Sequence, residues 1–166
     1  MKPLDALHHD IVLNWEALSR DDSQLNRRNY IRSLFAFYEV ALSNLRETAA
    51  QRMLRRFEAA GEWDIHSLSA LLDERPKLSG SGKISLEPNR LPFLPLVAHV
   101  LKTLSDLSDT DRNVLSDHRW GDFKASVEIR HRITHPKLYS DVEVTDEELR
   151  ILESGRTWWN ATLTQF

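Results

Sequence analysis

The sequence predicts an all-α protein, folded as an up-and-down bundle of about five or six helices. Apolar residues recur at helical spacing over most of the 166 residues. Only the stretch near 76–92 interrupts this periodicity, with glycine, proline and alternating residues. The length fits a single domain over 1–166 with its own core, and 76–92 is expected to form a flexible loop or small hairpin.

The composition is that of an ordinary globular protein, with 41% hydrophobic and 28% charged residues. The absence of cysteine excludes disulfides, thiolate zinc sites and cysteine nucleophiles. We find no signal segment and no apolar run of membrane length, so we expect a cytoplasmic protein with no membrane partner. Because the net charge is only -3, binding of nucleic acid would require a local basic patch.

Two helices are expected in the N-terminal part of the chain. Residues 4–19 carry apolar side chains at helical spacing. Residues 21–23 offer capping oxygens for a second helix over about 24–60, which contains no glycine or proline. Gly61 is a plausible stop for this helix.

The middle of the chain predicts shorter elements. A short helix is expected over 64–75, and a further helix over about 93–107. Between them, Ser-Gly-Ser-Gly at 79–82 and the alternating residues 83–87 indicate the loop or hairpin.

The C-terminal part is again helical. Asp109 or Thr110 is expected to cap one further turn. A helix over about 118–135 should end there, because Pro136 disfavours helical geometry in the residue before it. The sequence at 145–148 forms a capping box that opens the last helix.

The helix expected at 118–135 is predicted to be apolar on two roughly opposite faces. One face carries Trp120, Phe123 and Val127, and the other carries Ala125, Ile129 and Ile133. The second face would be covered by another helix or by a second subunit. Arg130, His131 and His135 would then replace expected apolar residues, which costs stability unless they are paired or used.

The segment 130–136 reads Arg-His-Arg-Ile-Thr-His-Pro, and it has a structural interpretation. Arg130 could pair with a carboxylate such as Glu39 or Glu128. The histidines would then only cap the helix end, where the helix dipole favours them. Taken alone, so short a pattern favours this interpretation.

In its context, the segment resembles the Arg-x4–6-His motif of the HEPN superfamily of ribonucleases. In that family the motif ends a bundle helix, and a short loop leads to another helix. The residues 30–32 and Glu39 of the long helix are similar to the family's second helix. The family often has asparagine after the arginine, where this chain has His131.

The residue types fit metal-independent cleavage of RNA, which needs a base, an acid and a cation. Histidine titrates near neutral pH, and arginine can hold two phosphate oxygens. We expect His135 to act as general base or acid and Arg130 to stabilise the phosphate in the transition state, while His131 orients His135 or the RNA. The residues expected to bind RNA or support the site are Arg132, Arg32, Glu39 and Lys137.

The resemblance implies an endoribonuclease of the toxin or anti-phage defence type. Its substrate would be RNA, and two copies would form a homodimer with facing motifs. An antitoxin or another defence component is an expected partner. The alternatives are a non-catalytic helical module that binds RNA, nucleotide or a partner protein in the same groove, and a purely structural bundle.

No metal and no cofactor are expected. His131 and His135 have the spacing of two metal ligands on one helix face. However, Arg132 stands where the His-Glu-x-x-His motif has glutamate, and neighbouring arginines would repel a cation.

Two further groups have alternative interpretations. The arginines of the long helix could follow a phosphate backbone or form a solvated face, and for 46–56 we favour the solvated face. Trp158 and Trp159 could stack on bases, but a core or dimer-interface role for at least one of them is favoured.

Overall fold

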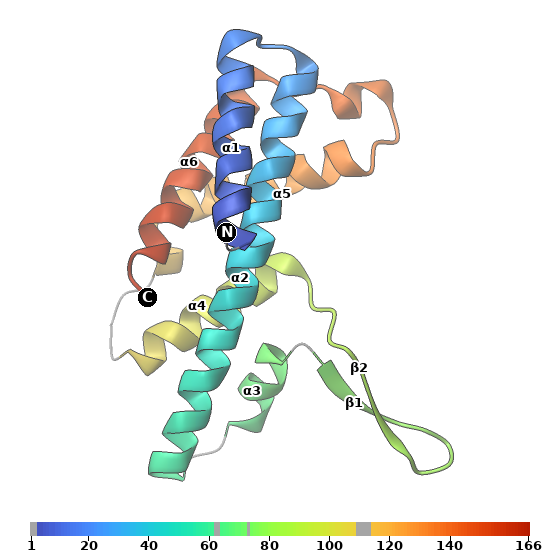
Figure 1. Cartoon of the computed structure of the whole chain (residues 1–166), viewed down its shortest axis with the longest axis vertical. Helices are drawn as coiled ribbons and strands as arrows, with labels where there is room; N and C mark the ends of the chain where they lie inside the picture. Colours follow the sequence, from blue (N-terminus) through green and yellow to red (C-terminus); the bar gives the residue numbers. More distant parts are fainter. Residues whose placement is uncertain (1–2, 62–63, 73, 109–113) are drawn as a thin grey trace. The chain divides into compact units, whose positions relative to one another are not determined.

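A computed structural model describes residues 3–61, 64–72, 74–108 and 114–166 (Figure 1). Within these residues the chain forms six α-helices, two 3-10 helices and one two-stranded sheet, which confirms the all-α prediction. The chain divides into two compact units. The terminal unit comprises Met1–Ala41 and Val114–Phe166, and the central unit comprises Leu42–Asn113. Among the described helices, none combines the length and apolarity needed to cross a bilayer.

Three predicted helices are confirmed almost to the residue. They are α1 (Pro3–Arg20), α2 (Gln24–Ala60) and α4 (Phe93–Leu107). The long helix α2 stops before Gly61, whose φ of 71° is a left-handed conformation that glycine adopts without steric cost. The backbone N–H of Gly61 donates to the carbonyl of Phe57 at 2.9 Å, which satisfies one of the last carbonyls of α2.

The segment predicted as a loop or hairpin forms an antiparallel hairpin of β1 (Glu74–Leu78) and β2 (Ile84–Pro88). The preceding helix α3 (Ile65–Leu71) is therefore shorter than the predicted 64–75, because the chain enters β1 at Glu74. Asp64 caps α3 by accepting a hydrogen bond from the Ser67 N–H at 2.9 Å. The predicted turn capped by Asp109 or Thr110 lies outside the described residues.

The hairpin is amphipathic, and neither of its faces is buried. One face carries four exposed apolar side chains: Pro76, Leu78, Ile84 and Leu86. On the other face Glu87 pairs with Arg75 at 2.7 Å and with Lys77 at 3.1 Å. These cross-strand ion pairs reinforce the strand register, since a one-residue slip would separate them.

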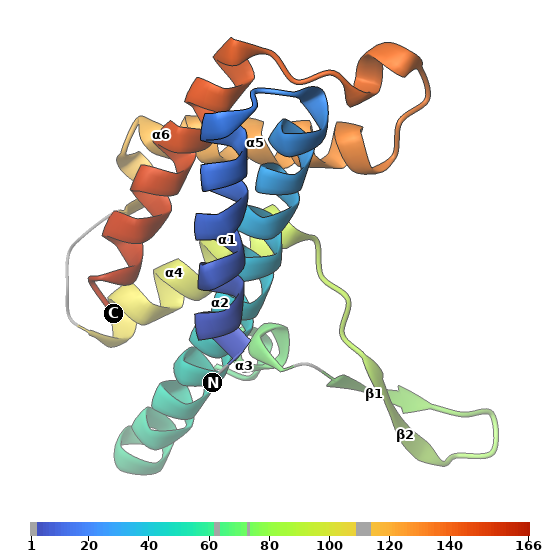
Figure 2. The same ribbon diagram turned by 45° about the horizontal axis from the view of Figure 1, so that its top comes forward.

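The terminal unit packs α1 and the first part of α2 with α5 (Arg119–Thr134) and α6 (Asp146–Leu163). Figures 1 and 2 both show α1 beside the start of α2, with α5 crossing behind them. The core is an aromatic cluster in which the rings of Tyr38, Phe123 and Trp159 lie 5.0 to 5.4 Å apart. Trp158 joins this cluster 4.9 Å from Phe123. Aromatic pairs at these distances add to the energy of their burial.

A glycine lets α5 and α6 approach closely. A Cβ at Gly155 would lie 2.9 Å from the Cα of Phe123, which is too short for an ordinary contact. Next to it, Ser154 donates to a carboxylate oxygen of Asp122 at 2.5 Å. The position of α5 is therefore set by contact between the two backbones and by a hydrogen bond between the two helices.

The prediction that α5 is covered on two opposite faces is wrong. Its buried residues form one stripe: Phe123, Ser126, Ile129 and Ile133. Buried Ser126 lies between the two predicted apolar faces and joins them into one. The opposite side of the helix carries the exposed residues Lys124, Glu128 and His131.

Candidate functional site

The candidate site lies where α5 ends, as the sequence predicted. His135 is the C-cap residue, and its backbone N–H donates to the carbonyl of His131 at 3.0 Å. The hydroxyl of Thr134 donates a hydrogen bond to the carbonyl of Arg130 at 2.7 Å. Because Pro136 has no N–H and disfavours helical geometry before it, the helix does not continue.

The two histidines of the segment lie side by side on the surface. The ring centroids of His131 and His135 are 5.0 Å apart, with 53° between the ring planes. Both residues are exposed, so they do not replace buried apolar residues as expected. A one-turn spacing on an open helix face leaves both rings accessible to a ligand.

Arg130 points toward α2. Its Nη2 donates to Oε1 of Glu39 at 2.9 Å, and its guanidinium carbon lies 6.0 Å from the centre of the Phe35 ring. Of the two carboxylates considered for Arg130, Glu39 is thus its partner. The Arg130 side chain is 35% exposed and the Glu39 side chain 52%, so solvent reaches this ion pair.

Arg132 holds the loop that follows α5. Its guanidinium donates to three backbone carbonyls, those of Ser140, Asp141 and Glu143, at 2.7 to 3.3 Å. It also pairs with Glu148 of α6 at 2.5 Å. With these donors committed inside the protein, Arg132 organises the loop rather than offering a free cation beside the histidines.

The other two predicted residues, Arg32 and Lys137, lie on the surface. Arg32 is exposed, with one hydrogen bond of 3.4 Å to Asn29, and it precedes Glu39 by two turns on the same side of α2. Lys137 is also exposed, and its backbone N–H donates to the carboxylate of Asp141 at 2.7 Å. The N–H groups of Leu138 and Lys137 lower the pKa of Asp141, since they stabilise its charged form. That carboxylate fixes η2 (Tyr139–Val142) directly after the motif.

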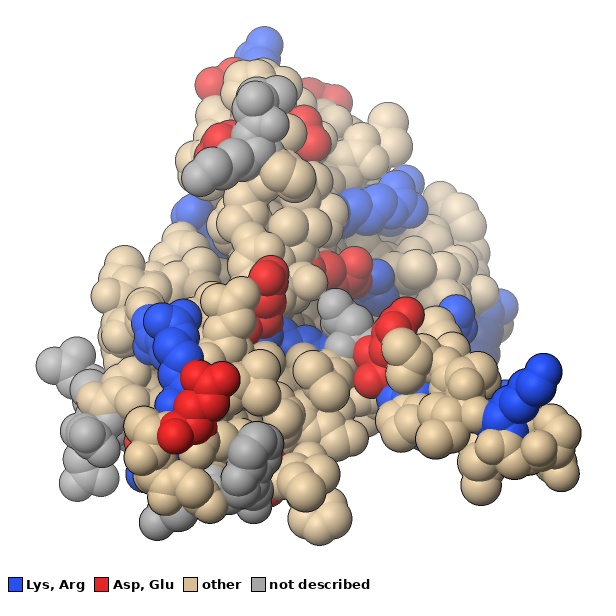
Figure 3. All heavy atoms as spheres, turned by 60° about the horizontal axis from the view of Figure 1, so that its bottom comes forward, with Lys and Arg blue, Asp and Glu red and all other residues tan. Residues whose placement is uncertain are grey.

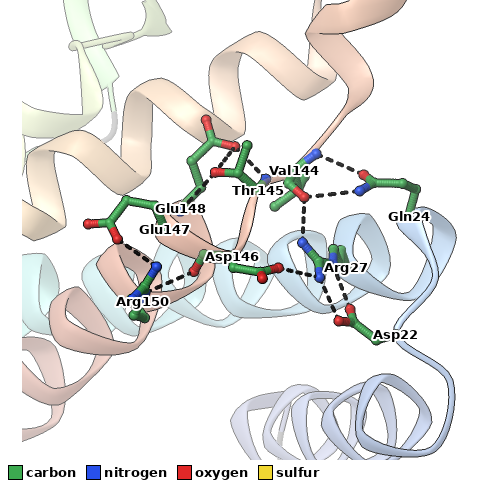
Figure 4. A network of polar contacts seen from close by, with 9 residues as sticks. All are labelled: Asp22, Gln24, Arg27, Val144, Thr145, Asp146, Glu147, Glu148 and Arg150. Atoms are coloured by element: carbon green, nitrogen blue, oxygen red, sulfur yellow. Dashed lines mark hydrogen bonds and ion pairs between the residues drawn. The ribbon is translucent and has the colours of Figure 1, made fainter.

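A polar network that the sequence analysis missed anchors the start of α6 (Figure 4). The side-chain amide of Gln24 donates to the Val144 carbonyl at 3.0 Å and accepts from the Val144 N–H at 2.7 Å. Arg27 donates to the same carbonyl at 2.7 Å. The sequence indicates only that residues 21–23 could cap α2 and that α2 carries a charged stripe. Neither pattern predicts that the Gln24 side chain binds the backbone of Val144, 120 residues further along the chain.

Arg27 is buried and pairs with two exposed carboxylates. It pairs with Asp22 at 2.5 Å and with Asp146 at 2.6 Å, and the whole residue is only 8% exposed. The hydrogen bond from Arg27 lowers the pKa of Asp22. A buried guanidinium with two partners contributes to the fold of the terminal unit and is withdrawn from any RNA-binding stripe.

The predicted capping box of α6 is confirmed. The Thr145 hydroxyl accepts from the Glu148 N–H at 3.2 Å, and the Thr145 N–H donates to Glu148 Oε2 at 2.9 Å. The other oxygen of Glu148 binds Arg132. Glu148 thus connects the end of α5 with the start of α6 and keeps the segment between them in place.

Trp158 and Trp159 belong to the core, which is the role that the sequence favoured for at least one of them. Trp158 and Trp159 are each 1% exposed, so neither can stack on a base. Trp158 Nε1 donates to the Val114 carbonyl of η1 (Val114–Ser116) at 3.0 Å.

The arginines of α2 do not form one phosphate-binding stripe. Arg27 is buried, and Arg28 donates to the Val142 carbonyl at 2.9 Å. In the central unit, Arg46 donates to the carbonyls of Ala70 and Leu72. On the face shown in Figure 3, basic side chains form separate small groups among acidic and uncharged ones.

The site can offer two imidazoles and one guanidinium. Within the described ranges, no three histidine, aspartate or glutamate side chains are grouped to hold a metal ion. Comparisons with models of protein families, with curated proteins and with solved structures found no match.

Proposed function

We propose that this chain is a metal-independent endoribonuclease of the HEPN type, cleaving RNA at the exposed end of α5. The observation that carries this proposal is the pair of imidazoles of His131 and His135, 5.0 Å apart on an open surface. Histidine titrates near neutral pH, so two adjacent rings can supply a general base and a general acid. Arg130 precedes them in the sequence and supplies a permanent positive charge.

In the proposed reaction one imidazole accepts the proton of the RNA 2′-hydroxyl, and the 2′-oxygen attacks the adjacent phosphorus. The bond from phosphorus to the 5′-oxygen breaks as the other ring, in its protonated form, donates a proton to the leaving oxygen. The products are a 2′,3′-cyclic phosphate and a 5′-hydroxyl. We assign His135 as base or acid, with His131 completing the pair, and Arg130 as the stabiliser of charge on the phosphate.

The ion pair between Arg130 and Glu39 has a place in this mechanism. An exposed ion pair contributes little, so a phosphate that binds Arg130 bidentately can displace Glu39 at small cost. The RNA phosphate and Glu39 would then compete for one guanidinium. The same ion pair also favours the second candidate function, a non-catalytic module, because Arg130 has a structural partner without RNA.

The decisive experiment uses RNA and DNA of the same sequence in excess chelator. RNA should be cleaved to 2′,3′-cyclic phosphate and 5′-hydroxyl ends, whereas DNA should stay intact because it lacks the attacking hydroxyl. His135→Ala and Arg130→Ala should each abolish cleavage while the circular dichroism spectrum is retained. Lys124→Ala, on the same exposed face of α5, is the matched control and should cleave normally.

Two outcomes would contradict the proposal. Full activity of a folded His135→Ala protein would show that cleavage does not use the imidazole pair of α5. Activity that chelator removes and zinc or magnesium restores would replace imidazole catalysis by metal chemistry.

The expected biology is a cytoplasmic toxin or anti-phage defence protein. Expression of the chain should then be toxic to cells, and Arg130→Ala should relieve that toxicity. An antitoxin or defence component is the expected partner. The proposed homodimer needs a separate argument, because the exposed side of α5 is polar and one chain already brings two histidines together. Light scattering at micromolar concentration tests the dimer independently of cleavage.

A further inference from the structure

The loop between α5 and α6 exposes two large hydrophobic side chains beside the proposed cleavage site. Tyr139 is 84% exposed, more than any other large hydrophobic side chain among the described residues, and Leu138 next to it is 68% exposed. Every residue from Thr134 to Ser140 is exposed, so an accessible surface runs without interruption from His135 to the Tyr139 ring. A side chain gains stability by leaving water, so the fold itself gives no reason for an aromatic ring at this position.

The loop that carries Tyr139 is held on both sides of that residue. Before it, the Asp141 carboxylate accepts the backbone N–H groups of the two residues that precede Tyr139, at 2.7 and 2.8 Å. After it, the Arg132 guanidinium binds the carbonyls of Ser140 and Asp141 at 3.3 and 2.7 Å. The exposed ring is therefore displayed by a fixed backbone, and a ligand that packs on it has little loop entropy to overcome.

Tyr139 lies within reach of any RNA strand that meets the two histidines of α5. Four residue steps lead from His135 to Tyr139, and even a fully extended chain of that length spans at most about 14 Å. The loop turns back instead, because Arg132 in the last turn of α5 binds the carbonyl of the residue after Tyr139. Successive nucleotides of a stacked strand rise about 3.4 Å. A base on this ring would therefore belong to a nucleotide only a few positions from the scissile phosphate.

We propose that Tyr139 is a stacking platform for an unpaired base of the RNA, a few nucleotides from the phosphate that is cleaved. This rests on the proposed ribonuclease function and adds a positioning residue to it. Single-stranded RNA presents unstacked bases, and aromatic side chains bind these through their flat faces. Because every base has such a face, the ring would hold the strand in place for the histidines without selecting one sequence. The substrate is then a single-stranded region, since a paired base inside a duplex has no free face to offer.

Exposed hydrophobic side chains can also bind a protein partner, but the size of this surface favours RNA. Only Leu138 and Tyr139 contribute large side chains to it, and exposed Lys137 and Ser140 stand on either side. A specific protein interface buries about 800 Å² on each partner, which two side chains cannot supply. One aromatic ring matches the size of one base.

Fluorescence anisotropy with a labelled single strand of 2′-O-methyl RNA tests the platform apart from cleavage, because its blocked 2′-oxygen cannot attack. Tyr139→Ala should weaken binding about tenfold, the effect expected from the loss of one base stack. Tyr139→Phe should bind as the unaltered chain does, since stacking uses the ring and not the hydroxyl. His118→Ala is the matched control, because it removes an 88% exposed ring at the opposite end of α5 and should leave binding unchanged.

A strand of the same length without bases separates stacking from charge. It keeps the phosphates, so it should bind the unaltered chain and Tyr139→Ala equally. Leu138→Ala should keep the affinity of the unaltered chain for the 2′-O-methyl strand, because it removes no aromatic ring. In cleavage assays Tyr139→Ala should raise the KM about tenfold and leave kcat unchanged, since the stack is the same before and during the reaction.

Several results would overturn the platform. One is equal affinity of the unaltered chain and of folded Tyr139→Ala protein for the 2′-O-methyl strand. Equally weak binding by Tyr139→Phe and Tyr139→Ala would assign the effect to the hydroxyl, and an equal loss on the strand without bases would assign it to charge. Equal losses in Leu138→Ala and Tyr139→Ala would indicate a hydrophobic surface for a protein partner instead.

Failure of the ribonuclease is recognised separately. If binding depends on Tyr139 but no RNA is cleaved, the platform stands and only the catalytic proposal fails. If RNA is cleaved and Tyr139→Ala leaves both its KM and its binding unchanged, the platform alone fails.

Discussion

Arg130 donates a hydrogen bond of 2.9 Å to Glu39, which joins the end of α5 to α2 and occupies the guanidinium proposed to meet RNA. Glu39→Gln should loosen this contact and leave Arg130 more available. The KM for RNA should fall by up to about fivefold, because an exposed ion pair is worth at most about 1 kcal/mol. Steady-state cleavage assays measure this change.

The control for that prediction is Glu128→Gln, which removes the same charge from the exposed face of α5. If both variants lower KM equally, the effect comes from net charge and not from release of Arg130.

Arg132 should matter for stability more than for RNA binding. Arg132→Ala removes contacts to three carbonyls and to Glu148, and it should lower the free energy of unfolding by about 2–3 kcal/mol. Arg150→Ala, which breaks an exposed pair with Glu147, should cost less than about 0.5 kcal/mol. Urea denaturation compares the two, and equal losses would contradict the role of Arg132 in holding the loop.

Two glycines should respond in opposite ways to alanine. Gly155→Ala places a Cβ 2.9 Å from the backbone of Phe123 and should destabilise the fold by about 1–3 kcal/mol, even though alanine favours helix. Gly121→Ala meets no atom within 4 Å and should stabilise α5 by up to about 1 kcal/mol. Thermal unfolding measures both changes. A neutral Gly155→Ala would show that α5 and α6 can move apart freely.

Acid should weaken the start of α5. The hydrogen bond from Arg119 lowers the pKa of Asp117 from 3.8 to about 2. A carboxylate whose folded pKa is depressed stabilises the fold above its unfolded pKa, and that stabilisation is lost as pH falls from 3.8 through 2. Asp117→Asn should therefore lose less stability than the unaltered chain between pH 5 and 2. Denaturation at a series of pH values measures the free energy of unfolding of both proteins. If this free energy falls equally steeply with acid in both, the prediction is contradicted.

Local signals in the sequence were sufficient for most of the helices. Capping at 145–148, the uninterrupted run of α2 and the position of Pro136 all act within a few residues, and the structure agrees with them. The predicted end of α3 is wrong, because Glu74 pairs with Pro88 in the hairpin and local sequence does not reveal this distant partner.

The site was only partly predictable, for a similar reason. Arg130 was rightly considered with Glu39, but the helix periodicity of α5 could not reveal that buried Ser126 joins its two apolar faces. The role of Arg132 depends on carbonyls of a loop with no sequence pattern of its own. Tertiary contacts made by backbone groups cannot be predicted from the amino-acid composition or from the spacing of residue types.

The hairpin carries a built-in defence against aggregation. The backbone N–H of Ser79 donates to the Lys83 carbonyl at 2.9 Å, so the N–H groups of the pairs 74–88, 76–86 and 78–84 point outward. Pro88 and Pro76 stand in the first two of these pairs, and both lack the N–H that a third strand would need. An exposed ribbon with Leu78, Ile84 and Leu86 on one face would otherwise be a template for fibrous assembly. Pro76 removes the central outward N–H of the β1 edge, and Pro88 removes the last one of the β2 edge.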